Sequence, residues 1–317
     1  MSITQKELAD KLNISTATVS RALAGSEKIS VETRRRVLQA ARQSGYNSRS
    51  RTVAVLIPEL HLTGYFGEAA TALFRELEQS GFRPLLLSAR HLDLLEELDI
   101  CGAISVLALN GLERSWGKNH ILPLVCINTA PNHLEGIYTV SSNDEQAMRI
   151  AIRHLYSLGH RKIGRLAFYG SLMREDNWNS VARGRCFKEE LENLGLCPDF
   201  SSYISDTNSC IEAMQELSEQ GVSAVILQDE ELELTVLQAL RIMKYKIPDD
   251  ISLVAWSFAG VGERVHPMLT TLVQDLPQLA RKSCEILRAL LNGENVIGDV
   301  FVDYQFYPRS STGACRR

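Results

Sequence analysis

The chain has 317 residues, of which 45% are hydrophobic and 23% charged, the balance of a soluble globular protein with about two domains. This composition excludes disordered, collagen-like and disulfide-stapled chains. The apolar runs fall short of the roughly 20 residues that span a bilayer, and the N-terminal segment lacks the apolar stretch of a secretory signal. Seven cysteines without a C-x-x-C pair predict reduced thiols. We therefore expect a cytoplasmic protein with no metal, no cofactor and no membrane partner.

The net charge of −4 conceals a strong asymmetry along the chain. Residues 1–51 hold ten Lys and Arg against four Asp and Glu, a net charge of +6. The remaining residues hold 24 and 34, a net charge of −10. A basic module on an acidic body indicates that the N-terminal part approaches a polyanion.

Residues 1–46 predict a compact unit of three short helices. Thr4 fits a capping box at the start of the first helix. Ser15 can cap the second helix and Ser30 the third, which Gly45 ends.

The first two of these helices carry the pattern of a helix-turn-helix, with Asn13 in the turn between them. Ala9 is small where the helices cross, and Ile14 and Val19 supply the apolar contact. Four side chains of the second helix then point outward: Thr16, Ala17, Ser20 and Arg21. Such a helix fits the major groove of DNA, and hydroxyls at helix starts suit phosphate oxygens. The alternative is an ordinary solvated helical face.

From residue 53 onward, short apolar runs alternate with amphipathic stretches. The expected strands are 53–57, 85–87, 102–107, 124–128, 162–168, 224–227 and 251–256. The expected helices are about 67–79, 144–157, 183–193, 211–219, 231–244 and 276–291. Gly81, Gly159, Gly195 and Gly221 end four of the helices. This rhythm predicts a parallel sheet flanked by helices, and the continuous apolar runs predict strands buried on both faces.

The stretch Ile14–Leu23, followed by Ile29–Arg34 and by Gly45-Tyr46, resembles the headpiece of lactose-repressor-type (LacI/GalR family) regulators. The body is similar to that family at 154–164, 247–254 and 267–272, so the resemblance covers essentially the whole chain. It implies a helix-turn-helix domain over 1–46 and a short linker over 47–52. It also implies a two-lobed α/β periplasmic-binding-protein-like (type I) domain over 53–317, with interleaved lobes divided near 141 and 271.

The resemblance also implies a function. The chain is expected to be a cytoplasmic homodimer, with a tetramer as the alternative, that binds a double-stranded DNA operator as a repressor. A small-molecule effector, such as a sugar or sugar phosphate, is expected between the lobes, acting either as an inducer or as a corepressor. Neither an enzyme nor a transport-type binding protein is favoured, because the chain lacks G-x-S-x-G, Walker A and H-E-x-x-H motifs as well as a signal peptide.

By the same resemblance, Thr16, Ala17 and Arg21 are the base-reading positions. The remaining expected DNA contacts are Thr4, Ser15, Thr18, Ser20, Ser30, Thr33, Tyr46, Arg49 and Arg51. The linker departs from the family, which has a longer segment with a hinge helix and a leucine wedge. Residues 47–52 hold no apolar side chain, so they form either an electrostatic arm with Arg49 and Arg51 or a plain flexible tether.

Six effector contacts are implied by the resemblance: Tyr65, Phe66, Asn128, Arg183, Asp229 and Ser257. Four of them have a structural alternative: Arg183 as a surface arginine, Asp229 as a helix N-cap, and the two aromatic residues as core. Trp256 is expected in the core. Ser257 stands where sugar-binding members have an aspartate, so a neutral sugar and an anionic or phosphorylated ligand held by Arg183 are both open.

Overall fold

The structure, a computed structural model, describes residues 3–23, 26, 28–44, 50–58, 62–88, 98, 100–106, 122–129, 137–169, 178–230, 232–257, 260–296 and 298–316. The chain divides into two compact units. Unit 1 is Met1–Ser141 with Pro277–Val300, and unit 2 is Ser142–Leu276 with Phe301–Arg317. The chain therefore passes between the units three times, and we call these passages the crossover segments. The sequence predicted two boundaries between the lobes, near 141 and 271. The third passage, after Val300, was not predicted.

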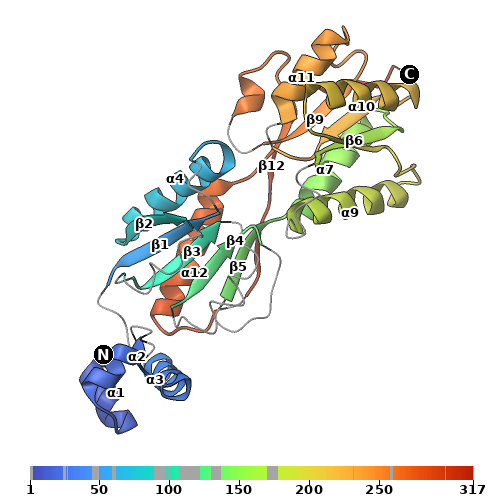
Figure 1. The fold of residues 1–317 in the computed structure, drawn as a ribbon. Coiled ribbons are helices and arrows are strands. Elements are labelled where there is room, and N and C mark those ends of the chain that lie inside the picture. The colour runs from blue at the N-terminus through green and yellow to red at the C-terminus, as the bar shows by residue number, and fades with distance from the viewer. Residues whose placement is uncertain are drawn as a thin grey trace. The chain divides into compact units, whose positions relative to one another are not determined.

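The headpiece consists of α1 (Gln5–Leu12), α2 (Thr16–Leu23) and α3 (Val31–Gln43), drawn in blue in Figure 1. The predicted capping box is present, since Thr4 Oγ1 accepts from the Glu7 amide and the Glu7 carboxylate accepts from the Thr4 amide. Asn13 ends α1 with a φ of 61°, a left-handed conformation in which Asn is enriched. Gly45 lies outside the described residues. The buried core of the headpiece is Leu8, Ala9, Val19, Ala22, Val37, Ala40 and Ala41.

Unit 1 also contains a six-stranded sheet in the order β11-β5-β4-β3-β1-β2. Its elements are β1 (Thr52–Ile57), α4 (Gly64–Gln79), β2 (Arg83–Ser88), β3 (Gly102–Val106), β4 (Leu124–Ile127), β5 (Ile137–Ser142), α12 (Leu276–Leu291) and β11 (Val300–Val302). Strands β1 to β5 pair in parallel, as predicted. The predicted helix from residue 67 begins three residues earlier, so Tyr65 and Phe66 lie in the first turn of α4.

Unit 2 has a sheet of the same size in the order β12-β10-β9-β8-β6-β7. Its elements are α7 (Asp144–Ser157), β6 (Ile163–Phe168), α9 (Trp178–Asn193), β7 (Ser201–Ile204), α10 (Thr207–Glu219), β8 (Ala224–Leu227), α11 (Leu232–Ile242), β9 (Ser252–Ser257), η1 (Val261–Glu263), β10 (Thr270–Val273) and β12 (Gln305–Tyr307). All pairs are parallel except β10 with β12, which is antiparallel. This confirms the α/β class with mainly parallel sheets.

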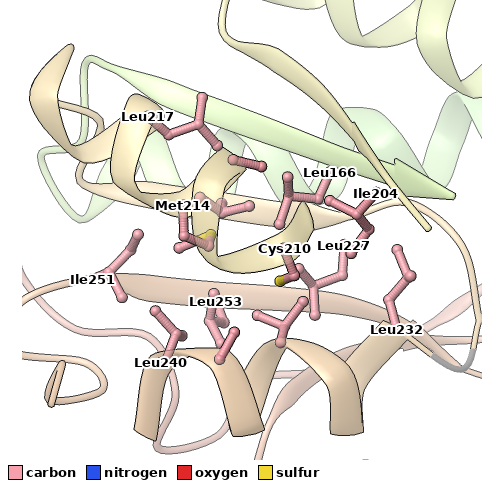
Figure 2. Packing of buried hydrophobic residues seen from close by; sticks show 14 of the residues in the cluster. Leu166, Ile204, Cys210, Met214, Leu217, Leu227, Leu232, Leu240, Ile251 and Leu253 are labelled. Atoms are coloured by element: carbon pink, nitrogen blue, oxygen red, sulfur yellow. The ribbon is translucent and has the colours of Figure 1, made fainter. Parts of the chain in front are cut away.

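Strand β8 shows why the apolar runs of unit 2 are continuous. Val225 and Leu227 face the cluster formed with α10 and α11, part of which Figure 2 shows around Met214 and Leu253. Ala224 and Ile226 face the opposite cluster, formed with α7 and α9. Because successive side chains of a strand point to opposite faces, a strand covered on both sides must be apolar at every position.

Five strands were not predicted: β5, β7, β10, β11 and β12. They are rich in serine and threonine or only three residues long, so they lack the apolar run by which the other strands were found. In β5 and β10 these hydroxyl residues are nevertheless buried, including Thr139, Ser141 and Thr271. Helix α9 also begins five residues before its predicted start. The four glycines predicted to end helices in the body all have a positive φ.

No helix among the described residues is long and apolar enough to cross a membrane. Within the same part of the chain, no group of three or more His, Cys, Asp and Glu side chains could hold a metal ion. All seven cysteines are free thiols, five of them buried. Burial raises the pKa of Cys210 to about 11 and that of Cys284 to about 12, so both remain protonated and unreactive at neutral pH.

Two histidines, the buried His160 and the partly buried His154, join the C-terminal segment to the rest of unit 2. His160 Nδ1 bonds to Ser223 Oγ at 2.8 Å and its Nε2 lies 3.1 Å from the Gly313 carbonyl. His154 Nε2 bonds to Thr312 Oγ1 at 2.9 Å. Burial lowers the pKa of both histidines below the ordinary value of 6.5, so the folded protein keeps them neutral.

These histidines predict a loss of stability in mild acid. Below pH 6.5 the unfolded chain binds protons at His154 and His160 that the folded chain does not, so the free energy of unfolding falls as the pH falls. Urea unfolding at pH 7.5, 6.5 and 5.5 should show this decrease. Burial also raises the pKa of Asp144 and Asp229, which acts in the opposite direction. The decrease should therefore be judged against a His154→Gln/His160→Gln variant, and an equally steep decrease in that variant would contradict the assignment.

Candidate DNA-binding face and effector site

The outer face of α2 carries the residues expected to read bases. Thr16, Ala17, Ser20 and Arg21 are all exposed. Val19, on the opposite side of the helix, is fully buried in the headpiece core. A rigid three-helix core thus presents a short helix with small side chains near its N-terminus and one guanidinium in its last turn. This is the geometry with which a recognition helix enters the major groove.

Hydroxyls expected to contact DNA also stabilise the starts of the headpiece helices. Ser15 Oγ accepts from the Thr18 amide at 3.0 Å and shares a 2.8 Å hydrogen bond with Thr18 Oγ1. Ser30 Oγ accepts from the Thr33 amide at 3.2 Å and donates to Thr33 Oγ1 at 2.8 Å. Ser15 and Ser30 are exposed, and their contacts with DNA stay a prediction.

Arg51, expected in an arm toward DNA, is joined to unit 1. Its carbonyl accepts from the Arg83 amide at 2.8 Å, which extends the edge of the sheet. Its guanidinium is 3.4 Å from the Gly81 carbonyl. A DNA contact by Arg51 would require the guanidinium to leave Gly81. Tyr46 and Arg49 lie outside the described residues.

In unit 1, three of the predicted effector residues lie together. Tyr65 and Phe66 are in the first turn of α4, with their ring centroids 5.6 Å apart in an edge-to-face arrangement. Asn128 follows β4 with a φ of 52°, and its Nδ2 donates to Tyr65 Oη at 2.6 Å. Both aromatic residues are partly buried, so core packing and ligand contact remain alternatives.

Gly67, in the first turn of α4, leaves no room for a side chain. A Cβ at residue 67 would lie 2.4 Å from the Leu62 carbonyl oxygen, a backbone atom that cannot rotate away. We expect Gly67→Ala to destabilise the protein by about 1–3 kcal/mol through overpacking, although alanine normally favours a helix. Gly184→Ala in α9 is the matched control, because its nearest neighbour is the movable guanidinium of Arg165. Thermal unfolding of both variants measures the effect, and equal melting temperatures would contradict it.

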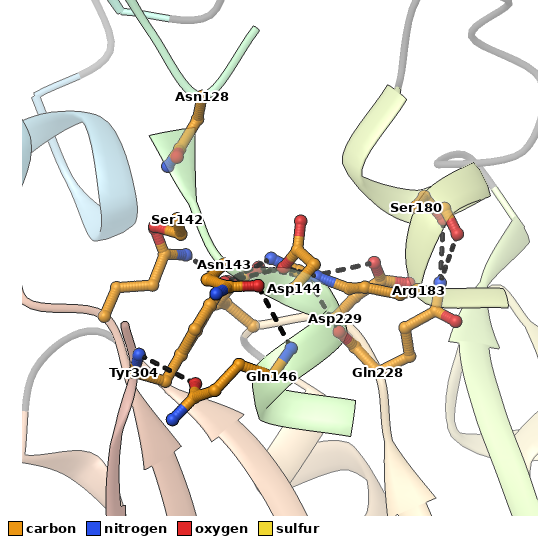
Figure 3. Close-up of polar contacts among 12 residues, drawn as sticks. Asn128, Ser142, Asn143, Asp144, Gln146, Ser180, Arg183, Gln228, Asp229 and Tyr304 are labelled. Carbon is orange, nitrogen blue, oxygen red and sulfur yellow. Dashed lines mark hydrogen bonds and ion pairs between the residues drawn. The ribbon is translucent and has the colours of Figure 1, made fainter. Parts of the chain in front are cut away.

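In unit 2, a buried ionic cluster surrounds Arg183 (Figure 3). Arg183 Nε donates to Asp144 Oδ1 at 2.8 Å, and Nη1 donates to the Gln228 carbonyl at 2.8 Å. Nη2 donates to Tyr304 Oη at 3.0 Å. Both terminal nitrogens also reach the Glu230 carboxylate, at 3.3 and 3.4 Å. All five N–H groups of the guanidinium therefore have acceptors within unit 2.

Burial and charge decide the protonation of this cluster. The side chains of Arg183 and Asp144 are only 4% and 1% exposed. Burial opposes the charged form of Arg183, but the neighbouring carboxylates outweigh it and raise the pKa of the guanidinium well above its ordinary value. Burial raises the pKa of Asp144 against the opposing effect of Arg183. Arg183 is thus an interior residue, and the alternative of a surface arginine was wrong.

The other two predicted residues of unit 2 lie at the carboxyl ends of their strands. Asp229 follows β8, is 8% exposed, and accepts from the Phe168 amide at 2.6 Å, so it joins the ends of β8 and β6. Burial raises the pKa of Asp229. Ser257 ends β9 and is buried. Trp256 is fully buried in the core, as predicted, with the Arg183 guanidinium 5.1 Å from its ring.

Sequence reasoning missed Asp144 and Tyr304 as members of the cluster. Asp144 begins α7 directly after the N-cap Asn143, and an acidic residue at a helix start is usually explained by the helix dipole alone. Tyr304 is 121 residues from Arg183 in sequence, so no local pattern could pair them. Among the described residues, Asp144 Oδ2 and Trp256 Nε1 are buried polar atoms without a hydrogen-bond partner.

Comparisons with known proteins agree with this arrangement. Residues 152–312 match the periplasmic binding protein-like domain family, and residues 4–48 match the family described as bacterial regulatory proteins, lacI family. A helical DNA-reading headpiece followed by a two-unit periplasmic-binding-protein-like body defines a class of bacterial transcription regulators. The chain belongs to the lacI family of bacterial regulatory proteins.

Individual relatives span nearly the whole chain. The chain is 27% identical to the HTH-type transcriptional repressor CytR of Escherichia coli (strain K12), over 98% of this chain and 96% of that protein. Its fold is similar to that of the transcriptional regulator CelR in complex with cellobiose, with a TM-score of 0.71, 23% identity, and coverage of 98% and 99%. It is also similar to the lac repressor dimer bound to operator and an anti-inducer, with a TM-score of 0.69, 19% identity, and coverage of 99% and 100%.

Proposed function

We propose that this protein is a sequence-specific transcriptional repressor that binds a double-stranded operator as a homodimer and responds to a small effector. The observation that carries the proposal is the exposed face of α2, on which Thr16, Ala17, Ser20 and Arg21 stand over a rigid core. The asymmetry of charge supports it, because a headpiece region of net charge +6 approaches DNA while a body of −10 is repelled.

Selection from a random duplex library tests this function. Full-length protein should enrich a pair of inverted half-sites about one helical turn, roughly 34 Å, apart, since a symmetric dimer places its recognition helices at that spacing. Repeating the selection with Arg21→Ala should lose the consensus within the half-sites. Failure of the wild-type protein to enrich any sequence would refute the proposal.

We also expect this protein to bend its operator little. Residues 47–52, which join the headpiece to the first strand, hold no apolar side chain that could wedge between base pairs. Unstacking one base step costs a few kcal/mol, and nothing in this segment offsets that cost. A circular-permutation gel assay should therefore show nearly equal mobility for all positions of the site. A strong minimum at the centre of the fragment would contradict this expectation.

The effector that fits unit 2 best is an uncharged polyhydroxy compound of the sugar type. Three carboxylates surround Arg183, and its five N–H groups already have acceptors. A phosphate would have to compete with Asp144 and Glu230 for this guanidinium and would be repelled by Asp229. Hydroxyl groups, in contrast, can donate to the carboxylates. The cellobiose bound to the similar regulator CelR agrees with this chemistry.

Matched ligand pairs test the choice of effector. Thermal shift should be measured with glucose, cellobiose and ribose, and with glucose 6-phosphate and ribose 5-phosphate. A ligand present at 100 times its dissociation constant stabilises the folded protein by about 2.7 kcal/mol, which is readily detected. We expect stabilisation by uncharged compounds. A larger shift with a phosphorylated sugar than with its parent sugar would contradict this proposal and favour the anionic alternative.

A further inference from the structure

On its unit 2 side, each crossover segment is adjacent to a residue that is hydrogen-bonded directly, or through one other side chain, to a member of the ionic cluster around Arg183. Ser142 and Asp144 follow the first crossover, Gln274 precedes the second, and Tyr304 follows the third. All their contacts described below lie within unit 2. The cluster therefore fixes the three places where the chain leaves or enters this unit.

Two branches of hydrogen bonds run from Arg183 to these residues. In the inner branch, Asp144 Oδ1 accepts from Arg183 Nε and from Tyr304 Oη, both at 2.8 Å. In the outer branch, Glu230 joins Arg183 to Gln274, because Gln274 Nε2 donates to Glu230 Oε1 at 2.6 Å. The outer branch ends at Ser142, whose Oγ donates to Gln274 Oε1 at 3.0 Å.

The two branches differ in their access to solvent. The side chain of Glu230 is 18% exposed, against 1% for Asp144 and 4% for Arg183. Glu230 follows β8 at the carboxyl end of the sheet, where α/β proteins bind their ligands. It is the most exposed of the three carboxylates around Arg183, since the side chain of Asp229 is 11% exposed, and a ligand can reach it without opening the inner branch.

We infer that Glu230 is the residue through which an effector acts on the crossover segments. An effector hydroxyl that donates to the Glu230 carboxylate competes with Gln274 and Arg183 for the same oxygens. Gln274 is then released from the outer branch, while Arg183 retains Asp144 and Tyr304. This inference rests on the proposed function and gives Arg183 the role of a positioning residue that keeps the inner branch in place.

Hydrogen exchange tests the inference without an effector. In Glu230→Met, a side chain of similar length lacks the acceptor oxygens, so amides of residues 270–276 should exchange about tenfold faster or more. Exchange at residues 143–146 and 301–304 should stay close to that of the wild-type protein. The matched control is Glu190→Met, because Glu190 is a 3% exposed carboxylate of the same unit whose ion pairs are with Arg149 and Arg153 and not with Arg183.

Unchanged exchange at 270–276 in Glu230→Met, or equal acceleration in Glu190→Met, would overturn the inference. Tyr304→Phe, which removes only one hydroxyl from the inner branch, should instead accelerate exchange at 301–304. A DNA titration with the same variants separates the inference from the proposed function. Glu230→Met should change DNA affinity by about fivefold or more and Glu190→Met should not. If the wild-type protein binds no DNA, the proposed function fails and hydrogen exchange alone decides the role of Glu230.

Discussion

We expect Arg183→Met to destabilise unit 2 by about 3–5 kcal/mol, the usual effect of removing one partner from a buried ionic group. The substitution leaves the Asp144 carboxylate, 1% exposed, without its cation, and removes the donors that Glu230 and the Gln228 carbonyl accept from. Methionine keeps much of the apolar volume, so the loss is mainly electrostatic. Urea unfolding followed by tryptophan fluorescence is a suitable measurement, because Trp256 lies against the guanidinium.

Arg185→Met is the matched control for this experiment. Arg185 lies two residues further along α9, is 58% exposed, and pairs with Glu145 and Glu189 on the surface. Exposed ion pairs contribute about 0–1 kcal/mol, so this variant should unfold almost as the wild-type protein does. Similar losses in the two variants would show that Arg183 is no more important to folding than a surface arginine.

The second large effect concerns the choice of DNA sequence. We expect Arg21→Ala to reduce affinity for the selected operator by about 5- to 150-fold, equivalent to the 1–3 kcal/mol of one good base contact, and to affect random duplex much less. Thr33→Ala should instead weaken operator and random duplex by a similar factor, because a hydroxyl on phosphate carries no sequence information. Fluorescence anisotropy with both duplexes gives the ratio of the affinity for the operator to the affinity for random duplex. If Arg21→Ala reduced affinity for operator and for random DNA by the same factor, Arg21 would not be a base-reading residue.

The headpiece could be predicted almost completely from its sequence. Its caps at Thr4, Ser15 and Ser30 and its turn at Asn13 are set by residues three or four positions away. The exposed set on α2 follows from the 3.6-residue period around the buried Val19. In this part of the chain, residues that are close in sequence determine the helices, their caps and their exposed face. A short stretch of sequence was therefore enough to predict them.

The effector site could be predicted only in part. Asn128 and Tyr65, which the resemblance placed in one site, do lie together in unit 1. The surroundings of Arg183 could not be predicted, because Asp144, Glu230 and Tyr304 lie 39, 47 and 121 residues away in sequence. Strand β5, which precedes Asp144, and strand β10, which precedes Gln274, are rich in buried hydroxyls. They escaped prediction for the same reason, since their polar side chains are satisfied by tertiary contacts.

The role of Arg183 changes most between sequence and structure. By the resemblance it was expected to contact the effector directly, with a neutral sugar and an anionic ligand both open. With its five N–H groups accepted inside unit 2, it is an organiser of carboxylates, and the acidic Glu230 becomes the accessible charge. The sequence left both an anionic and a neutral effector open. With the structure, the proposed effector is the neutral one.

The central claim is that the basic headpiece binds DNA, and a titration against salt tests it most directly. Affinity of the full-length protein for its selected duplex should be measured from about 50 to 200 mM salt, where contacts with 6–10 phosphates reduce affinity by about 10³- to 10⁵-fold. We predict a steep linear decrease of log K with log salt concentration, with Arg21→Ala on the same slope at lower affinity. Absence of binding at low salt, or an affinity that does not depend on salt, would contradict the account.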